Sequence, residues 1–92
     1  MGMSASEPTT DQLAPLGLPS AIRLQASKLL RAISSAATLE DALRAADRAE
    51  GFALGIETVR ALNPGDVEEL YLVFDRAYQA RHSELDAYTP CC

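Results

Sequence analysis

The chain contains few large or chemically reactive side chains. Its 92 residues include no tryptophan, two phenylalanines, three tyrosines and one histidine. A chain of this length forms one domain, and a core of alanine and leucine buries less apolar surface per residue than a core of aromatic rings. We therefore expect modest stability for an isolated chain. This expectation favours association with another protein or with itself as a homodimer.

Several classes of protein are disfavoured by what is missing. A net charge of −5 is unsuited to broad contact with nucleic acid phosphates. No apolar run approaches the roughly 20 residues that cross a membrane. The first residues also lack the positive start and apolar block of a secretory signal. We predict a cytoplasmic protein, and the abundance of arginine and alanine is typical of a GC-rich bacterial or phage gene.

Cysteine occurs only as the adjacent pair Cys91 and Cys92, which is too close for ordinary disulfide geometry and fits a reducing compartment. Together with His82, this pair supports an alternative hypothesis of a metal- or thiol-binding protein. The spacing lacks the CxxC pairs of structural zinc sites. No Ser-His-Asp or Cys-His arrangement is indicated, so we predict that the protein is not an enzyme and has no cofactor.

Two long helices joined by a tight turn are the clearest structural signal. Thr38 is a suitable N-cap for a helix that we expect to reach Leu62. In the turn Asn63-Pro64-Gly65-Asp66, Asn63 is a second N-cap and Pro64 occupies a first helical position. The following helix is expected to end between Leu85 and Ala87. The pattern predicts an antiparallel helical hairpin.

An amphipathic helix is predicted before the hairpin, from Pro19 or Ser20 to Ala36, because apolar residues recur there at helical spacing. The predicted fold class is therefore all-α, either as a three-helix bundle of one chain or as a homodimer in which hairpins pair. We assign residues 18–88 to one helical domain.

Proline-rich composition predicts a flexible N-terminal tail at residues 1–17, and residues 89–92 are predicted to form a frayed end. Within or just after the tail, Leu13, Leu16 and Leu18 are apolar residues available to pack against the helical domain.

Within the hairpin, large rings of the third predicted helix are expected to face small residues of the second. Phe74 is expected near Ala53, since layers of large and small side chains interdigitate. Gly51 and Gly55 lie in the same predicted helix as Ala53. A helix this rich in small residues is expected to allow close approach of another helix.

Seven residues are candidates for binding a partner. Leu24, Leu72 and Val73 lie outside the main apolar stripes and are expected to be exposed. The first helix has no acidic residue, so its cations form a local basic face. Arg81 lies in the aromatic face of the third helix, where it either pairs with Glu50 or Asp47 or anchors a partner. The candidates are Leu24, Arg23, Lys28, Arg31, Leu72, Val73 and Arg81.

The preferred interpretation is a small non-enzymatic module for protein–protein interaction, such as an adaptor, chaperone, inhibitor or regulatory subunit. Besides the metal or thiol alternative, the basic first helix leaves open a nucleic-acid-associated regulator, although the acidic overall charge makes nucleic acid an unlikely partner.

Overall fold

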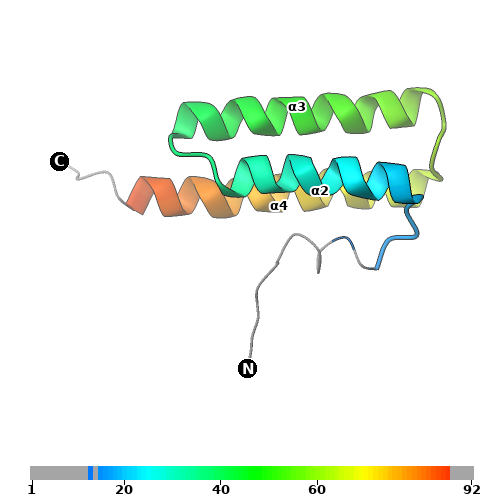
Figure 1. Cartoon of the computed structure of the whole chain (residues 1–92), viewed down its shortest axis with the longest axis horizontal. Helices are drawn as coiled ribbons and strands as arrows, with labels where there is room; N and C mark the ends of the chain where they lie inside the picture. The colour runs from blue at the N-terminus through cyan, green and yellow to red at the C-terminus, as the bar shows by residue number, and fades with distance from the viewer. Residues whose placement is uncertain (1–12, 14, 88–92) are drawn as a thin grey trace.

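The described part of the chain is a bundle of three helices. The computed structural model describes residue 13 and residues 15–87. Helix α2 spans Ser20–Ser34, α3 spans Leu39–Thr58 and α4 spans Pro64–Ala87. Each helix contacts both of the others, and α3 runs antiparallel to α2 and α4 (Figure 1). The predicted all-α fold, a helical hairpin with an N-terminal helix packed on it, is confirmed.

Both predicted N-caps close the first turns of their helices. The Thr38 hydroxyl accepts a hydrogen bond from the backbone amide of Asp41 at 3.0 Å. Asn63 Oδ1 accepts one from the amide of Asp66 at 2.9 Å, and Asn63 Nδ2 donates to the Asp66 carboxylate at 3.1 Å. These bonds satisfy amides that have no partner inside the helix. The start of α4 is therefore determined by four consecutive residues.

Helix α3 ends earlier than predicted, at Thr58 instead of Leu62. Arg60 adopts the left-handed conformation, with φ of 57°. The Arg60 amide donates to the Glu57 carbonyl at 3.1 Å, and the Ala61 amide donates to the Ile56 carbonyl at 3.0 Å. This pair of bonds is a Schellman motif. Sequence reasoning missed it because an arginine occupies the position where glycine usually marks the end of a helix.

The core lies along the line where the three helices meet. Ala49 and Ala53 of α3 are fully buried, and they share one cluster with Phe74 of α4. Leucine and isoleucine side chains from α2 complete this cluster. The expected packing of small residues on α3 against larger residues on α4 is confirmed, and it brings the two helix backbones into a closely packed hairpin.

The glycines of α3 do not take part in this packing. Gly51 and Gly55 are exposed, and a Cβ atom added to either would meet no atom within 4 Å. Within the described chain, the close approach expected of this helix therefore comes from its buried alanines and not from its glycines. The reason is geometric, because both residues lie on the outer face of α3, away from the face that carries the buried alanines.

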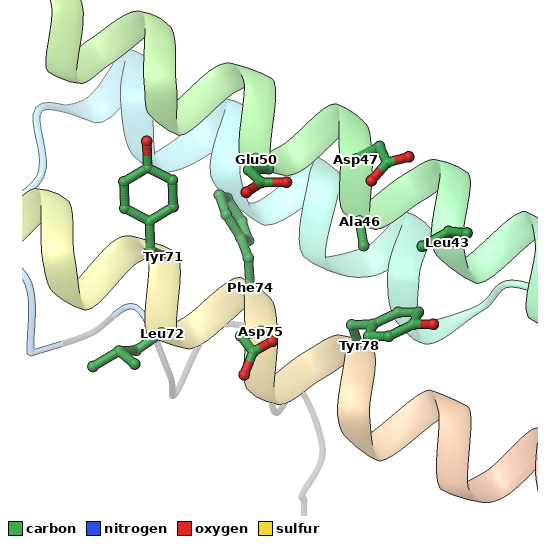
Figure 2. A pocket seen from close by; sticks show the side chains of 9 residues that line it. All are labelled: Leu43, Ala46, Asp47, Glu50, Tyr71, Leu72, Phe74, Asp75 and Tyr78. Carbon is green, nitrogen blue, oxygen red and sulfur yellow. The ribbon is translucent and has the colours of Figure 1, made fainter.

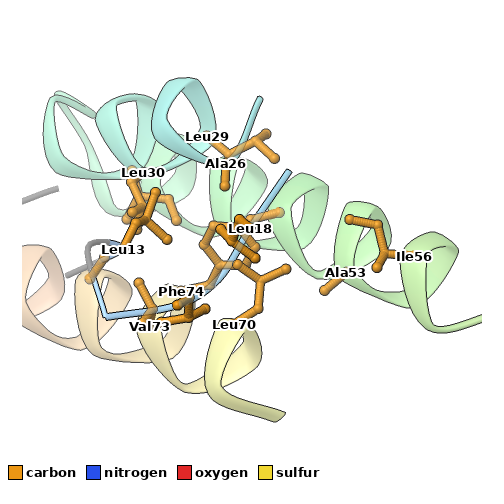
Figure 3. Close-up of a cluster of buried hydrophobic side chains, with 14 of the residues drawn as sticks. Leu13, Leu18, Ala26, Leu29, Leu30, Ala53, Ile56, Leu70, Val73 and Phe74 are labelled. Atoms are coloured by element: carbon orange, nitrogen blue, oxygen red, sulfur yellow. The ribbon is translucent and has the colours of Figure 1, made fainter. Parts of the chain in front are cut away.

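The segment before α2 packs into the core. Leu13 is only 1% exposed, and Leu16 and Leu18 are also buried. The segment runs beneath α2 and α4 on the side away from α3 (Figure 1), and Leu13 lies with Leu30 of α2 and Val73 of α4 (Figure 3). These three leucines therefore pack against the helical domain, as their apolar character allowed. Most of the predicted tail (residues 1–12 and 14) and the predicted frayed end (89–92) lie outside the described residues.

Candidate functional site

A groove runs along the surface between α3 and α4. Its volume is about 360 Å³ and residues from both helices line it. Apolar and aromatic side chains form most of its surface, and carboxylates project from both helices at its edges (Figure 2). We call this hollow the α3–α4 groove. Its lining residues are Leu43, Ala46, Asp47, Glu50, Tyr71, Leu72, Phe74, Asp75 and Tyr78.

Helical periodicity places these residues together. On α3, Leu43, Asp47 and Glu50 recur at intervals of four and three, so they lie along one stripe. On α4, Tyr71, Asp75 and Tyr78 recur at the same intervals. The stripes flank the buried alanines and Phe74, so the groove lies at the edge of the core. Ala46 has a small side chain between the stripes, which leaves the space that the rings of α4 border.

Two leucines remain exposed on opposite sides of the groove. Leu43 of α3 is 50% exposed and Leu72 of α4 is 43% exposed. An isolated exposed leucine has no special meaning in a folded protein. Here the two residues come from different helices and both line one hollow, so exposed apolar side chains lie at both of its borders.

The groove carries negative charge that the described chain does not balance. Among the described residues, no cationic side chain lines it. Within residues 15–87, Asp47, Glu50 and Asp75 have no ion pair or hydrogen bond through their carboxylates. Three arginines pair with other acids instead, in the pairs Arg44–Glu40, Arg76–Glu69 and Arg81–Glu84. The carboxylates at the groove therefore remain available to cations from outside.

Tyr71 forms one end of the groove. Its hydroxyl donates a hydrogen bond of 3.0 Å to Glu57 of α3. Loss of solvation at the hydroxyl, then this hydrogen bond and the negative charges of Glu57 and Glu50, raise the pKa of the Tyr71 phenol above its ordinary value of 10.0. Tyr71 thus stays a neutral donor near pH 7. It also lines a second hollow, which reaches the α3–α4 turn through Leu62 and Pro64.

The structure separates the predicted apolar candidates. Leu24 is 59% exposed on α2 and Leu72 is exposed at the groove, so their expected exposure is confirmed. Val73 is only 1% exposed, and its predicted exposure is wrong. The error arose because α4 is covered from two directions. The α3 side was evident from the hairpin, whereas Val73 lies under α2 and Leu13 (Figure 3).

Arg23 has a structural partner that its sequence position did not reveal. Its guanidinium donates from Nη1 to the Leu13 carbonyl at 3.0 Å and from Nη2 to the Leu16 carbonyl at 2.8 Å. Lys28 and Arg31 are exposed on α2. The predicted basic face therefore does not contain three equivalent cations, because Arg23 fastens the segment before α2 to the helix.

Arg81 pairs with neither of its predicted acids. Its Nε donates to the Ala36 carbonyl at 2.8 Å, and its Nη1 lies 2.9 Å from the Glu84 carboxylate. The predicted pairing with Glu50 or Asp47 is wrong. Arg81 reaches the connection between α2 and α3 instead, where it satisfies a carbonyl beyond the end of α2. This choice of partner leaves Asp47 and Glu50 without a cation.

The residues of the metal hypothesis are not brought together in the described structure. The His82 ring packs edge-on against Tyr78, with 5.8 Å between ring centroids. Cys91 and Cys92 lie outside the described residues. Among the residues that the structure describes, no group of three His, Cys, Asp or Glu side chains is arranged to hold a metal ion.

The predicted site contained Leu72 but not the rest of the groove. Leu43, Asp47, Glu50 and Asp75 were not recognised, although the three-and-four spacing of leucine and acids on α3 was a usable signal. The comparisons with known proteins add no further assignment: no family model, curated protein or solved structure matches this chain. None of the described helices combines the length and apolar character that crossing a bilayer requires.

Proposed function

We propose that this protein is a non-enzymatic interaction module that binds a partner protein in the α3–α4 groove. The observation that carries the proposal is the pair of exposed leucines, Leu43 and Leu72, on either side of one apolar hollow. Covering exposed apolar surface of this kind is a main source of binding free energy between proteins. The adaptor, chaperone, inhibitor and regulatory-subunit roles expected from the sequence all use such a face.

The character of the groove supports a binding role over a catalytic one. Its polar groups are carboxylates and tyrosine hydroxyls. Its lining within the described part of the chain includes no histidine and no cysteine. General acid–base catalysis is most effective when a group has a pKa near the working pH, and Tyr71 is shifted in the opposite direction. The groove therefore offers contact area and charge in place of a reaction centre.

A matched pair of double variants tests this proposal. Leu43→Ala/Leu72→Ala removes the two leucines of the groove, and Leu24→Ala/Leu54→Ala removes two exposed leucines outside it. Each variant is attached to a support, incubated with lysate of the native host, and compared with the unaltered chain by quantitative mass spectrometry. Circular dichroism first establishes that both variants are folded.

The expected result is a protein whose capture is lost in the groove variant and kept in the control variant. That protein is then purified, and calorimetry should show that it binds directly to the unaltered chain. Equal capture by both variants contradicts the proposal. Loss only in Leu24→Ala/Leu54→Ala assigns binding to other surfaces. If the captured protein is the chain itself, light scattering should give twice the chain mass, as the predicted homodimer requires.

A further inference from the structure

We propose that the occupant of the α3–α4 groove is a short amphipathic helix of another protein that carries two or more lysine or arginine residues. This inference rests on the proposed function, because it specifies the partner of the same groove. Three features carry it: the length of the groove, the position of its unpaired carboxylates, and the sequence charge of the segments outside the described residues.

The dimensions of the groove suit about two turns of helix. Its lining runs from Leu43 to Glu50 on α3 and from Tyr71 to Tyr78 on α4. At a rise of about 1.5 Å per residue, each stretch is about 10 Å long. A helix lying along this line would place one or two apolar side chains over Ala46 and Phe74, between the two exposed leucines.

The carboxylates define the chemistry of the occupant's flanks. Asp47 and Glu50 project from α3 and Asp75 projects from α4, so acids lie on both sides of the groove (Figure 2). Asp47 and Glu50 are three residues apart, about one helical turn. Two cations spaced three or four residues apart on a bound helix match this separation. The rings of Tyr71 and Tyr78 add faces on which a guanidinium or ammonium group is attracted.

The chain's own segments are poor candidates for this groove. Residues 1–12 contain Glu7 and Asp11 and no lysine or arginine, and residues 88–92 contain no charged side chain. A second copy would bring its own net charge of −5 toward this one, which opposes association at moderate salt. A cationic partner is drawn toward the groove by the same field. Charge complementarity therefore favours a different, basic protein.

Selection from an unbiased library tests the inference. Amphipathic helical peptides of about 15 residues, long enough to form helix, are displayed with randomised polar positions and selected for binding to the full chain. Peptides that also bind Leu43→Ala/Leu72→Ala are discarded, so only groove-dependent binders remain. We expect these peptides to be enriched in lysine or arginine pairs spaced by three or four residues.

Matched charge variants then measure the electrostatic part. Asp47→Asn/Asp75→Asn removes two of the three negative charges that line the groove, and Asp41→Asn/Asp86→Asn removes the same amount of charge elsewhere. For a selected peptide we expect affinity about fivefold to tenfold lower in the groove variant and less than about twofold lower in the control. Added salt should weaken binding to the unaltered chain more than to the groove variant.

The outcomes separate this inference from the proposed function. Groove-dependent peptides without an excess of cations overturn the inference and leave the groove as a binding site. Selection that yields no groove-dependent peptide overturns both proposals. A mass increase of the chain alone, abolished by Leu43→Ala/Leu72→Ala, shows that a second copy is the occupant and also overturns the inference.

Discussion

The two sides of helix α4 are lined by neighbouring residues and are covered very differently. Toward α2, Val73 is 1% exposed, and Leu13 and Leu30 lie beside it (Figure 3). At the border of the α3–α4 groove, the preceding residue, Leu72, is 43% exposed, and its side chain points away from α3 (Figure 2). We call these the covered side and the open side of α4.

The covered side shows what this chain does when it closes a surface between helices. It supplies leucines from the segment before α2, and Arg23 holds the carbonyls of that segment. The open side also has leucines and aromatic rings, but it carries acids where the covered side has Arg23. No described segment fills it. This contrast supports the proposal that a cationic occupant covers the open side, because the described residues place no cation there.

Substitutions at the adjacent positions 72 and 73 should have the largest difference in effect on stability. Val73→Asp places a carboxylate in the core and should cost at least about 3 kcal/mol of unfolding free energy, whereas Leu72→Asp should change it by less than about 0.5 kcal/mol. Urea denaturation measures both. If Val73→Asp does not fold, Val73→Ala should show a loss of about 2 kcal/mol. Similar losses at positions 72 and 73 would contradict the distinction between the two sides.

Removing the leucine that fills the covered side should have the next largest effect. Leu13→Ala leaves a cavity near Val73 and should lower the unfolding free energy by about 2–4 kcal/mol. The matched change Leu24→Ala affects an exposed side chain and should cost less than about 0.5 kcal/mol. Equal midpoints in thermal denaturation for the two variants would show that the segment before α2 contributes little to stability.

The hydrogen bonds from Arg23 to the segment before α2 can be removed without creating a cavity in the core. Arg23→Met keeps much of the side-chain length but loses both hydrogen bonds, and we expect a loss of about 1–2 kcal/mol. Lys28→Met removes one exposed charge from the same helix and should have little effect. Hydrogen exchange should show faster exchange of the Leu16 amide only in Arg23→Met, because this amide donates to the Leu13 carbonyl that Arg23 also binds.

The outer face of α3 provides a smaller test with the opposite sign. Since a Cβ at Gly55 would meet nothing, Gly55→Ala should stabilise the helix by about 0.5–1 kcal/mol. Chemical denaturation of the variant checks the increase. Loss of self-association or of partner binding in Gly55→Ala would instead reveal a contact surface on the outer face of α3, separate from the α3–α4 groove.

The smallest expected effect on stability concerns the titration of Tyr71, which lies at one end of the α3–α4 groove. Because the Tyr71 pKa is raised, folding favours the neutral phenol. The resulting stabilisation is complete below pH 10.0 and is lost as the pH rises through the folded-state pKa. Ultraviolet absorbance of tyrosinate, compared between the chain and Tyr71→Phe, isolates this titration. Glu57→Gln should move it to lower pH, and an unchanged titration would show that Glu57 does not influence Tyr71.

Part of the candidate site was accessible from the sequence. The exposure of Leu72 followed from its distance from the apolar stripe of its helix. The same argument failed at Val73, because a single stripe describes a helix with one neighbour and α4 has two. The sequence also did not reveal that Asp47 and Glu50 have no ion-pair partner among the described residues. Spacing alone allowed Arg81 to reach them, and only the structure shows it bound to Ala36 and Glu84.

The three helices, the two N-caps and the reversal at Asn63 follow from local sequence. Each depends on contacts within about four residues, or on a periodicity that one helix carries alone. Packing between distant segments determines which side of α4 is closed, which partners Arg23 and Arg81 bind, and which described acids have no partner. These features depend on segments distant in sequence competing for the same surface, and local propensity carries no information about which of them prevails.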